Sequence, residues 1–171
     1  MELYDTIGGG YDNTRCADPY ILGRLLYHLG SNAHGDYLDV GCGTGNYTTG
    51  LFGLGMRMVG LDLSTTMFER AKHKGPEIRW NLASADAMAF ASKSFAGAVA
   101  TFVHHHFKHP QECFRETFRV LQPAARFVLF TTTAEQMRGY WLNEYFPRAM
   151  ATSIEQFEVL QTIQRQPQAL T

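Results

Sequence analysis

The apolar residues of this chain form two kinds of pattern that alternate along it. Short continuous apolar runs, which suit buried strands, occur at 37–40, 56–61, 78–82, 97–103 and 127–130. Between these runs, apolar residues recur every three or four positions, which predicts helices at 19–29, 46–54, 65–74 and 110–121. Alternating strands and helices favour an α/β domain with a largely parallel sheet.

Residues at the ends of the predicted helices support these boundaries. Asp18 can cap the first helix and Pro19 suits its first turn, while Ser64 can cap the helix that follows it. Pro110 begins another helix, and Gly30 follows the end of the first one. The predicted elements are therefore short and well delimited.

Three alternating glycines, Gly41, Gly43 and Gly45, end the first predicted strand. Their bare backbone lets a ligand approach a helix N-terminus closely, whereas an ordinary turn needs only one glycine. Asn46 occupies the position of the third glycine in the dinucleotide-binding pattern G-x-G-x-x-G. A ligand that has a ribose but lacks a pyrophosphate therefore fits this loop better.

An acidic residue, Asp62, ends the second predicted strand. Open parallel sheets bind ligands in the crevice outside the carboxyl ends of their strands. A carboxylate at that edge can accept two hydrogen bonds from a ribose diol. Because Ser64 can cap the next helix itself, we expect Asp62 to bind the ligand.

The charge and composition of the chain do not indicate nucleic acid or a membrane. Its 171 residues include 15 Lys plus Arg and 16 Asp plus Glu, without a basic run that could neutralise several phosphates. No apolar run approaches membrane-spanning length, and the acidic N-terminus lacks the apolar core of a secretion signal. The three cysteines have no CxxC spacing, which favours reduced thiols. We expect a cytoplasmic protein with a small-molecule substrate.

The segment Leu38-Asp-Val-Gly-Cys-Gly-Thr-Gly-Asn46 resembles the first motif of class I S-adenosylmethionine-dependent methyltransferases, and Gly60-Leu-Asp-Leu-Ser64 resembles the end of their second strand. The chain looks like a methyltransferase type 11-like domain. This resemblance implies a Rossmann-like three-layer sandwich, S-adenosylmethionine as cofactor, and methyl transfer to a small molecule by in-line displacement. Two alternatives remain open: a nicotinamide-dependent oxidoreductase, and a non-catalytic nucleoside-binding module.

The resemblance also assigns cofactor contacts within residues 18–135, the expected cofactor-binding domain. The implied contacts are Asp39, Gly41, Cys42, Gly43, Gly45, Asp62, Leu63, Met67, Ser84, Ala85, Asp86 and Thr101. Two alignments compete after the third strand. If Phe90 ends the family motif, Ser84 replaces the usual adenine-binding acid and Ala85 offers its backbone N–H; otherwise Asp86 is that acid.

Residues 1–17 form a polar, glycine-rich arm that we expect to act as a lid. In the resembling enzymes such a segment crosses the cofactor. Tyr11 would then lie near the sulfonium and Arg15 near the methionyl carboxylate. The alternative is a frayed terminus with a solvated arginine.

Histidines follow the fourth predicted strand at His104, His105, His106 and His109. Adjacent residues of an extended strand point to opposite faces, so they would not converge on one metal ion, and no metal site is expected. His104 or His105 is the candidate general base, since histidine titrates near neutral pH. The competing interpretation is that both pack in the interior.

The C-terminal part of the chain departs from the family pattern. Residues 136–171 are expected to form a helical substrate-side segment and tail, which leaves out the closing strand hairpin. The fifth strand would then be an uncovered edge, with Phe127, Leu129 and Phe130 exposed to self-association. Alternatively, the aromatic segment 140–146 folds back over it. Where relatives have Pro-Gly-Gly, Ala124 or Ala125 would be strained by a positive φ.

Overall fold

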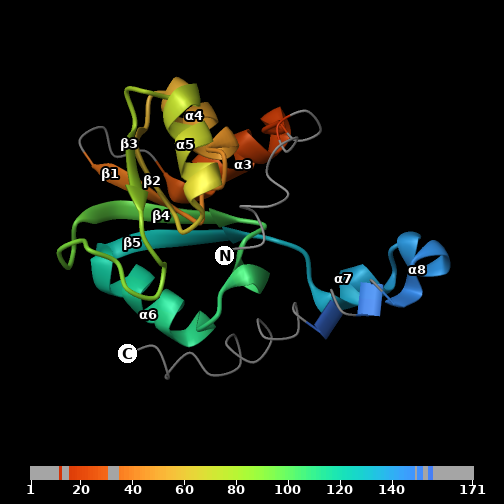
Figure 1. Ribbon diagram of the computed structural model, residues 1–171. Coiled ribbons are helices and arrows are strands. Elements are labelled where there is room, and N and C mark those ends of the chain that lie inside the picture. The colour runs from red at the N-terminus through yellow and green to blue at the C-terminus, as the bar shows by residue number, and fades with distance from the viewer. Residues whose placement is uncertain (1–11, 13–15, 31–34, 149, 152–153, 156–171) are drawn as a thin grey trace.

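A computed structural model describes residues 12, 16–30, 35–148, 150–151 and 154–155. Its centre is a five-stranded parallel sheet with the strand order β3-β2-β1-β4-β5 (Figure 1). The strands are β1 (Asp36–Val40), β2 (Arg57–Asp62), β3 (Arg79–Leu82), β4 (Phe95–Thr101) and β5 (Leu121–Phe130). The order reverses between β1 and β4, so the crevice for a ligand is expected there.

Helices cover both faces of the sheet and complete a three-layer sandwich (Figure 1). One face carries α3 (Pro19–Leu29), α4 (Asn46–Gly53) and α5 (Thr65–Lys74), and the other carries α6 (Pro110–Val120). Three further short elements are the 3-10 helix η2 (His104–His106), α7 (Ala134–Arg138) and α8 (Leu142–Tyr145). The α/β Rossmann-like architecture predicted from the sequence is confirmed.

The predicted helix caps are present. The Asp18 side chain accepts hydrogen bonds from the backbone N–H groups of Tyr20 and Ile21 at 2.8 and 3.0 Å. Ser64 Oγ accepts one from the N–H of Met67 at 3.3 Å. These bonds satisfy donors at the first turns of α3 and α5, which have no partner within the helix.

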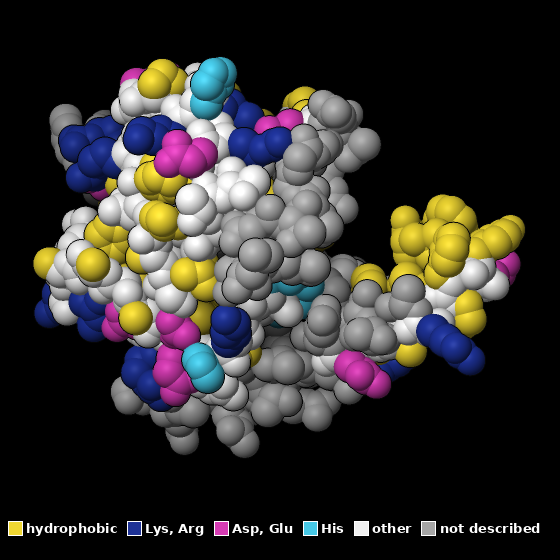
Figure 2. Space-filling view, in the orientation of Figure 1, with side chains coloured by type: hydrophobic (Ala, Val, Ile, Leu, Met, Phe, Trp, Pro, Cys, Tyr) yellow, Lys and Arg dark blue, Asp and Glu magenta, His cyan; other side chains and the backbone are white. Residues whose placement is uncertain are grey.

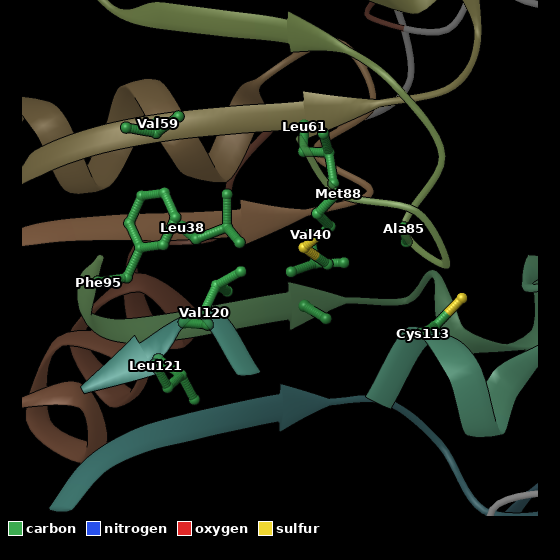
Figure 3. Close-up of a cluster of buried hydrophobic side chains, with 12 residues drawn as sticks. Leu38, Val40, Val59, Leu61, Ala85, Met88, Phe95, Cys113, Val120 and Leu121 are labelled. Atoms are coloured by element: carbon green, nitrogen blue, oxygen red, sulfur yellow. The ribbon is translucent and has the colours of Figure 1, made fainter. Parts of the chain in front are cut away.

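Successive side chains of a strand point to opposite faces of the sheet, so the buried residues form one cluster on each face. Leu38 and Val40 of β1 face the α6 side, where they belong to one cluster with Val120 (Figure 3). Tyr37 faces the opposite side and packs in a second cluster with Leu25 of α3. Each fully buried aliphatic side chain contributes about 1.5–3 kcal/mol, so these clusters hold the helices against the sheet.

The end of β4 and the start of β5 differ from the predicted boundaries for reasons of backbone geometry. β4 ends at Thr101, because Phe102 has φ +50° and turns the chain out of the sheet. The histidines that follow form η2, so the expected extended strand through residue 103 is wrong. β5 begins directly after α6, and its pairing with β4 shifts between Phe95 and Gly97, where β5 has extra residues relative to β4.

β5 is one of the two edge strands of the described sheet, with β3 at the other edge, and its apolar side chains are partly covered. Phe127 is half-buried and its ring contacts Phe114 and Phe118 of α6. Phe130 is also half-buried and contacts Phe102. The edge is therefore less exposed than the sequence predicts.

The aromatic segment at 140–146 does not cover this edge. Its residues project from the body of the domain as an apolar patch on α8 and its flanks (Figure 2). Trp141 is 59% exposed and Tyr145 is 67% exposed. The alternative in which these aromatics fold back over the sheet is therefore wrong.

The strain expected near residue 124 is present, because Ala124 has φ +64°. Ala124→Gly should raise the free energy of unfolding by about 1 kcal/mol, since glycine adopts left-handed backbone without the Cβ cost. Ala125→Gly is the matched control and should lower that energy by about 0.5–1 kcal/mol, because glycine loses more entropy in a strand. Urea denaturation measures the unfolding free energy of each variant. Equal changes in the two variants would show that Ala124 is not strained.

Candidate functional site

A cavity of about 620 Å³ lies at the carboxyl ends of the parallel strands. Its walls include the residues that end or follow four strands: Gly41 after β1, Asp62 of β2, Ala83 after β3 and Thr101 of β4. This is the edge at which open α/β sheets bind ligands, and the volume suits a small organic molecule. The described residues thus contain a cavity where the sequence predicts one.

The glycine loop between β1 and α4 is held in left-handed backbone. Gly41, Gly43 and Gly45 have φ of +70°, +56° and +76°. The N–H groups of Gly41 and Cys42 both donate to the Leu61 carbonyl, at 2.8 and 2.9 Å. These bonds tie the loop to β2 at the edge of the cavity.

The three glycines have different neighbours, although the sequence suggested one reason for all of them. A Cβ at Gly41 would overlap the Val103 side chain, and one at Gly45 would lie 2.5 Å from the Trp80 ring. A Cβ at Gly43 would meet nothing within 4 Å, and Gly43 lines the cavity. Only Gly43 therefore offers open space beside bare backbone, whereas Gly41 and Gly45 make room for side chains of the protein.

Asp62 connects the glycine loop to the end of β2. Its Oδ2 accepts a hydrogen bond from the N–H of Gly43 at 2.7 Å, and its Oδ1 accepts one from the N–H of Ser64 at 2.9 Å. Each carboxylate oxygen has two lone pairs, so each can accept a further bond from a ligand hydroxyl. The carboxylate lines the cavity in an orientation fixed by two backbone groups.

A polar cluster that the sequence did not reveal joins residue 12 to the glycine loop. Asp12 Oδ1 accepts bonds from Thr44 Oγ1 at 2.6 Å, Lys74 Nζ at 2.9 Å and Asn46 Nδ2 at 3.2 Å. Burial alone would raise the pKa of Asp12, but these bonds and the Lys74 charge outweigh it and lower that pKa. The ionised carboxylate thus links this point of the N-terminal arm to two residues that line the cavity, Thr44 and Asn46.

Asp39 lies in the core beneath the loop and does not line the cavity. Its Oδ2 accepts a hydrogen bond from Thr48 Oγ1 at 2.6 Å, whereas its Oδ1 has no hydrogen-bond partner among the described residues. Burial, with a smaller effect from the charge of Asp62, raises the pKa of Asp39 to about 7, against the opposing effect of the Thr48 bond. Asp39 therefore lies beneath the cavity wall, and its expected contact with the cofactor stays a prediction.

Most of the residues predicted for the site lie around this one cavity. Those that line it are Gly41, Cys42, Gly43, Asp62, Leu63, Met67, Ser84, Ala85, Asp86, Thr101 and His105. Asp39, Gly45 and His104 do not line it, and Tyr11 and Arg15 lie outside the described residues. Because Ser84, Ala85 and Asp86 all line the cavity, both sequence alignments after β3 remain open.

Several lining residues were missed, mainly in the segment after β4. They include Phe102, His106, Phe107 and Lys108. The sequence treated 102 and 103 as strand, so it did not place them at the open edge. A signal was available in the strand order, because residues that follow a central parallel strand reach the ligand crevice.

His104 and His105 have different surroundings within η2. His104 is 3% exposed and its Nδ1 lies 3.0 Å from Thr131 Oγ1, which fixes the ring away from the cavity. His105 lines the cavity. Burial and the neighbouring histidines lower the pKa of His104 to about 4 and that of His105 to about 3. Both rings are therefore neutral near pH 7, and of the two candidate bases only His105 lines the cavity.

Two of the thiols in the cavity wall, those of Cys42 and Cys113, have raised pKa values. Burial, followed by the charges of Asp39 and Asp62, raises the pKa of Cys42 well above its usual value. Burial and nearby carboxylates raise the pKa of Cys113 to about 12. Both thiols thus stay protonated and are poor nucleophiles. Within the described residues, no group of three or more His, Cys, Asp or Glu is arranged to hold a metal ion.

The buried Asp39 predicts a specific pH dependence. Its unfolded carboxyl ionises near 3.8, whereas the folded one keeps its proton up to about 7, so its contribution to stability falls as pH rises between these values. Asp39→Asn cannot ionise and should gain about 1–3 kcal/mol relative to the parent between pH 4 and pH 8. Urea denaturation of both proteins at several pH values measures this difference, and a difference independent of pH would contradict it.

The glycine neighbours predict unequal effects of one added methyl group. Gly43→Ala and Gly45→Ala both introduce a Cβ at positive φ, which costs about 1–2 kcal/mol. Only Gly45→Ala adds a clash with Trp80, so it should lower the unfolding free energy by about 1–3 kcal/mol more than Gly43→Ala. Introducing Trp80→Leu should recover part of this excess. Equal losses without recovery would show that the indole is not the obstacle.

Comparison with known proteins gives a consistent result. Residues 38–129 match the family model described as "Methyltransferase domain". A demethylmenaquinone methyltransferase of Tropheryma whipplei is 27% identical over 136 residues, which are 75% of this chain and 56% of that protein. A 2-phytyl-1,4-naphtoquinone methyltransferase of Thermosynechococcus vestitus is 29% identical over 120 residues, covering 63% of this chain and 53% of that protein.

A solved structure agrees with these relatives. The crystal structure of a putative methyltransferase from an antibiotic biosynthesis pathway of Anabaena variabilis superposes with a TM-score of 0.80 at 25% identity, covering 92% of this chain and 61% of that one. The chain thus spans between about half and three fifths of these similar proteins. Neither the family match nor these relatives support the oxidoreductase alternative. The chain belongs to the methyltransferase-domain family, whose methyl donor is S-adenosylmethionine.

Proposed function

We propose that this domain binds S-adenosylmethionine along the carboxyl edge of its sheet and transfers the methyl group to a small molecule. The observation that carries the proposal is the pairing of Asp62 with the Gly43 N–H at 2.7 Å, beside open space in the cavity. This arrangement places a fixed carboxylate next to bare backbone at the switch point of the sheet. A nucleoside ribose fits both features.

The residues of the cavity can be assigned to parts of the cofactor. Asp62 would accept hydrogen bonds from the two ribose hydroxyls, because its oxygens are already oriented by Gly43 and Ser64. The polar groups at 84–86 line the cavity next to the end of β3 and suit the adenine. The absence of a Cβ at Gly43 leaves room for the amino-acid part of the cofactor.

Methyl transfer mainly requires the protein to align the two reactants and to exclude water. When bound, S-adenosylmethionine supplies a methyl group on a positively charged sulfur. The protonated thiols of Cys42 and Cys113 do not compete as nucleophiles. The walls therefore contribute by holding the two reactants in line, which accounts for much of the rate in such displacements.

The acceptor would lie over the ends of β4 and β5, next to Phe102 and His105, because the cofactor contacts occupy the β1–β3 side. The names of the quinone methyltransferases above describe small-molecule substrates, which supports an acceptor of similar size here. No helix within the described part of the chain has the length and apolar character needed to cross a membrane.

Further proposals concern the organisation of the protein. We propose a lid arm at 1–17, a cofactor-binding domain at 18–135 and a substrate-side segment at 136–171. The three cysteines are free thiols, which supports a location in the reducing cytoplasm. Self-association through β5 is supported by its edge position, although α6 covers part of its apolar surface.

Isothermal titration with S-adenosylmethionine, S-adenosylhomocysteine and NADH tests the proposal. Asp62→Ala should weaken binding of the first two by about 1.5–3 kcal/mol, because it removes charge-assisted hydrogen bonds. Gly43→Val should weaken binding at least as much, since its branched side chain enters the open space of the cavity. Both variants should still unfold cooperatively on heating.

Glu77→Ala is the matched control, because it removes an exposed carboxylate that does not line the cavity. It should bind the cofactor like the parent protein. Tighter binding of NADH than of S-adenosylhomocysteine would contradict the proposal. An unchanged affinity of Asp62→Ala would remove that residue from the site.

A further inference from the structure

The wall that follows β4 is built around a strained aromatic residue. Phe102 has φ +50°, which is uncommon for a bulky side chain and costs of the order of 1–3 kcal/mol. Its N–H donates to the Phe130 carbonyl at 2.9 Å and its ring meets Phe130 edge-on at 4.9 Å. The Phe102 side chain is nevertheless 46% exposed and lines the cavity. The fold thus tolerates strain that presents an aromatic ring beside the ligand space.

Next to this ring, η2 holds an imidazole in a fixed position. The buried His104 lies 3.0 Å from Thr131 Oγ1, and this contact joins the ends of β4 and β5. The His104 and His105 rings then meet edge-on at 5.4 Å, which restrains His105 at the cavity wall. Because burial and its histidine neighbours lower the pKa of His105 to about 3, its ring is neutral at pH 7 and presents one N–H donor.

Charge is distributed unevenly around the cavity. Among the described lining residues, the carboxylates are Asp62 and Asp86, which belong to the end of β2 and the loop after β3. The lining residues at the end of β4 and just after it, within 101–108, include no carboxylate and one cation, Lys108. A cationic amine placed at this wall would find no counter-charge, and its proton would find no effective base in His105.

We propose that the methyl acceptor is an aromatic ring carrying an ionised hydroxyl, which packs against Phe102 while its oxyanion accepts a hydrogen bond from His105. This inference rests on the proposed methyl transfer and specifies its substrate class. A flat ring suits the exposed face of Phe102. A negative oxygen is attracted to the donor's sulfonium, and the lining residues at 101–108 include no carboxylate that would repel it.

The reaction balances without a protein base at the moment of transfer. The acceptor hydroxyl loses its proton to solvent before it binds, so the reacting oxygen carries the negative charge. An oxygen lone pair forms the bond to the methyl carbon while the carbon–sulfur bond breaks and leaves its electron pair on sulfur. The products are a neutral aryl methyl ether and a neutral thioether, so the opposite charges of the two reactants cancel during the transfer.

Three probe molecules of similar size test the inference by binding. They are 4-nitrophenol at pH 8, where it is ionised, the neutral 4-nitroaniline, and the cation benzylamine. Each is titrated calorimetrically into the protein saturated with S-adenosylhomocysteine, or with sinefungin, which carries a positive charge near the position of the sulfonium. The phenolate should bind at least about tenfold more tightly than the other two, which corresponds to one hydrogen bond to a charged group. Sinefungin should strengthen phenolate binding and weaken benzylamine binding.

Variants separate the two contacts. His105→Leu should reduce phenolate affinity about tenfold, and His105→Asn should restore part of it through its amide N–H. Phe102→Asn tolerates the left-handed backbone and should weaken all three probes without changing their order. His73→Leu is the control, because it removes an exposed histidine that does not line the cavity. Each variant is first checked for cooperative thermal unfolding and for binding of S-adenosylhomocysteine.

The outcomes are distinguishable. If the protein does not bind S-adenosylhomocysteine, the proposed function fails and this inference fails with it. If it binds S-adenosylhomocysteine but takes up benzylamine or 4-nitroaniline as tightly as the phenolate, or binds no phenolate, only the acceptor class is wrong. An unchanged preference in His105→Leu would also overturn the role given to His105.

Discussion

Left-handed backbone in the glycine loop is the constraint on which the site depends. Gly41, Gly43 and Gly45 all have φ between +56° and +76°, a conformation that costs other residues about 1–2 kcal/mol each. The turn brings the N–H groups of the loop to the Leu61 carbonyl and the Asp62 carboxylate. The parallel pairing of β1 with β2 therefore sets the position of the loop, and the loop in turn orients the carboxylate that faces the cavity.

Trp80 is the side chain around which this region packs. Its ring lies against the bare backbone of Gly45 and Gly60, where an added Cβ would overlap it, and its Nε1 donates to the Gly75 carbonyl at 2.7 Å. One indole from β3 thus contacts β2, the start of α4 and the end of α5. Two of these glycines belong to motifs that the sequence attributed to a ligand, yet their immediate neighbour is this indole.

The sequence predicted the architecture because the relevant signals are local. Continuous apolar runs and helical periodicity place most elements within a few residues, and the edge rule for parallel sheets places Asp62 beside the glycine loop. Nothing in the apolar pattern around Phe102 indicates its positive φ. The prediction therefore missed the end of β4 and the geometry of the histidines that follow it. The contacts of Asp12 with Lys74 and of Trp80 with Gly45 join residues far apart in sequence, and apolar periodicity carries no information about them.

The histidines after β4 show how burial keeps titratable rings neutral beside a cavity. Three adjacent imidazoles near a cavity would repel a sulfonium if they were protonated. Desolvation lowers the pKa of His104 and His105, and the electrostatic effect of neighbouring histidines lowers both pKa values further, so that these rings are neutral near pH 7. The carboxylate of Asp62, fixed by backbone N–H groups, remains on the other side of the same cavity. The cavity thus combines a negative group on one wall with aromatic rings, neutral imidazoles and the cation of Lys108 on another, an arrangement that suits the proposed positively charged methyl donor and its acceptor.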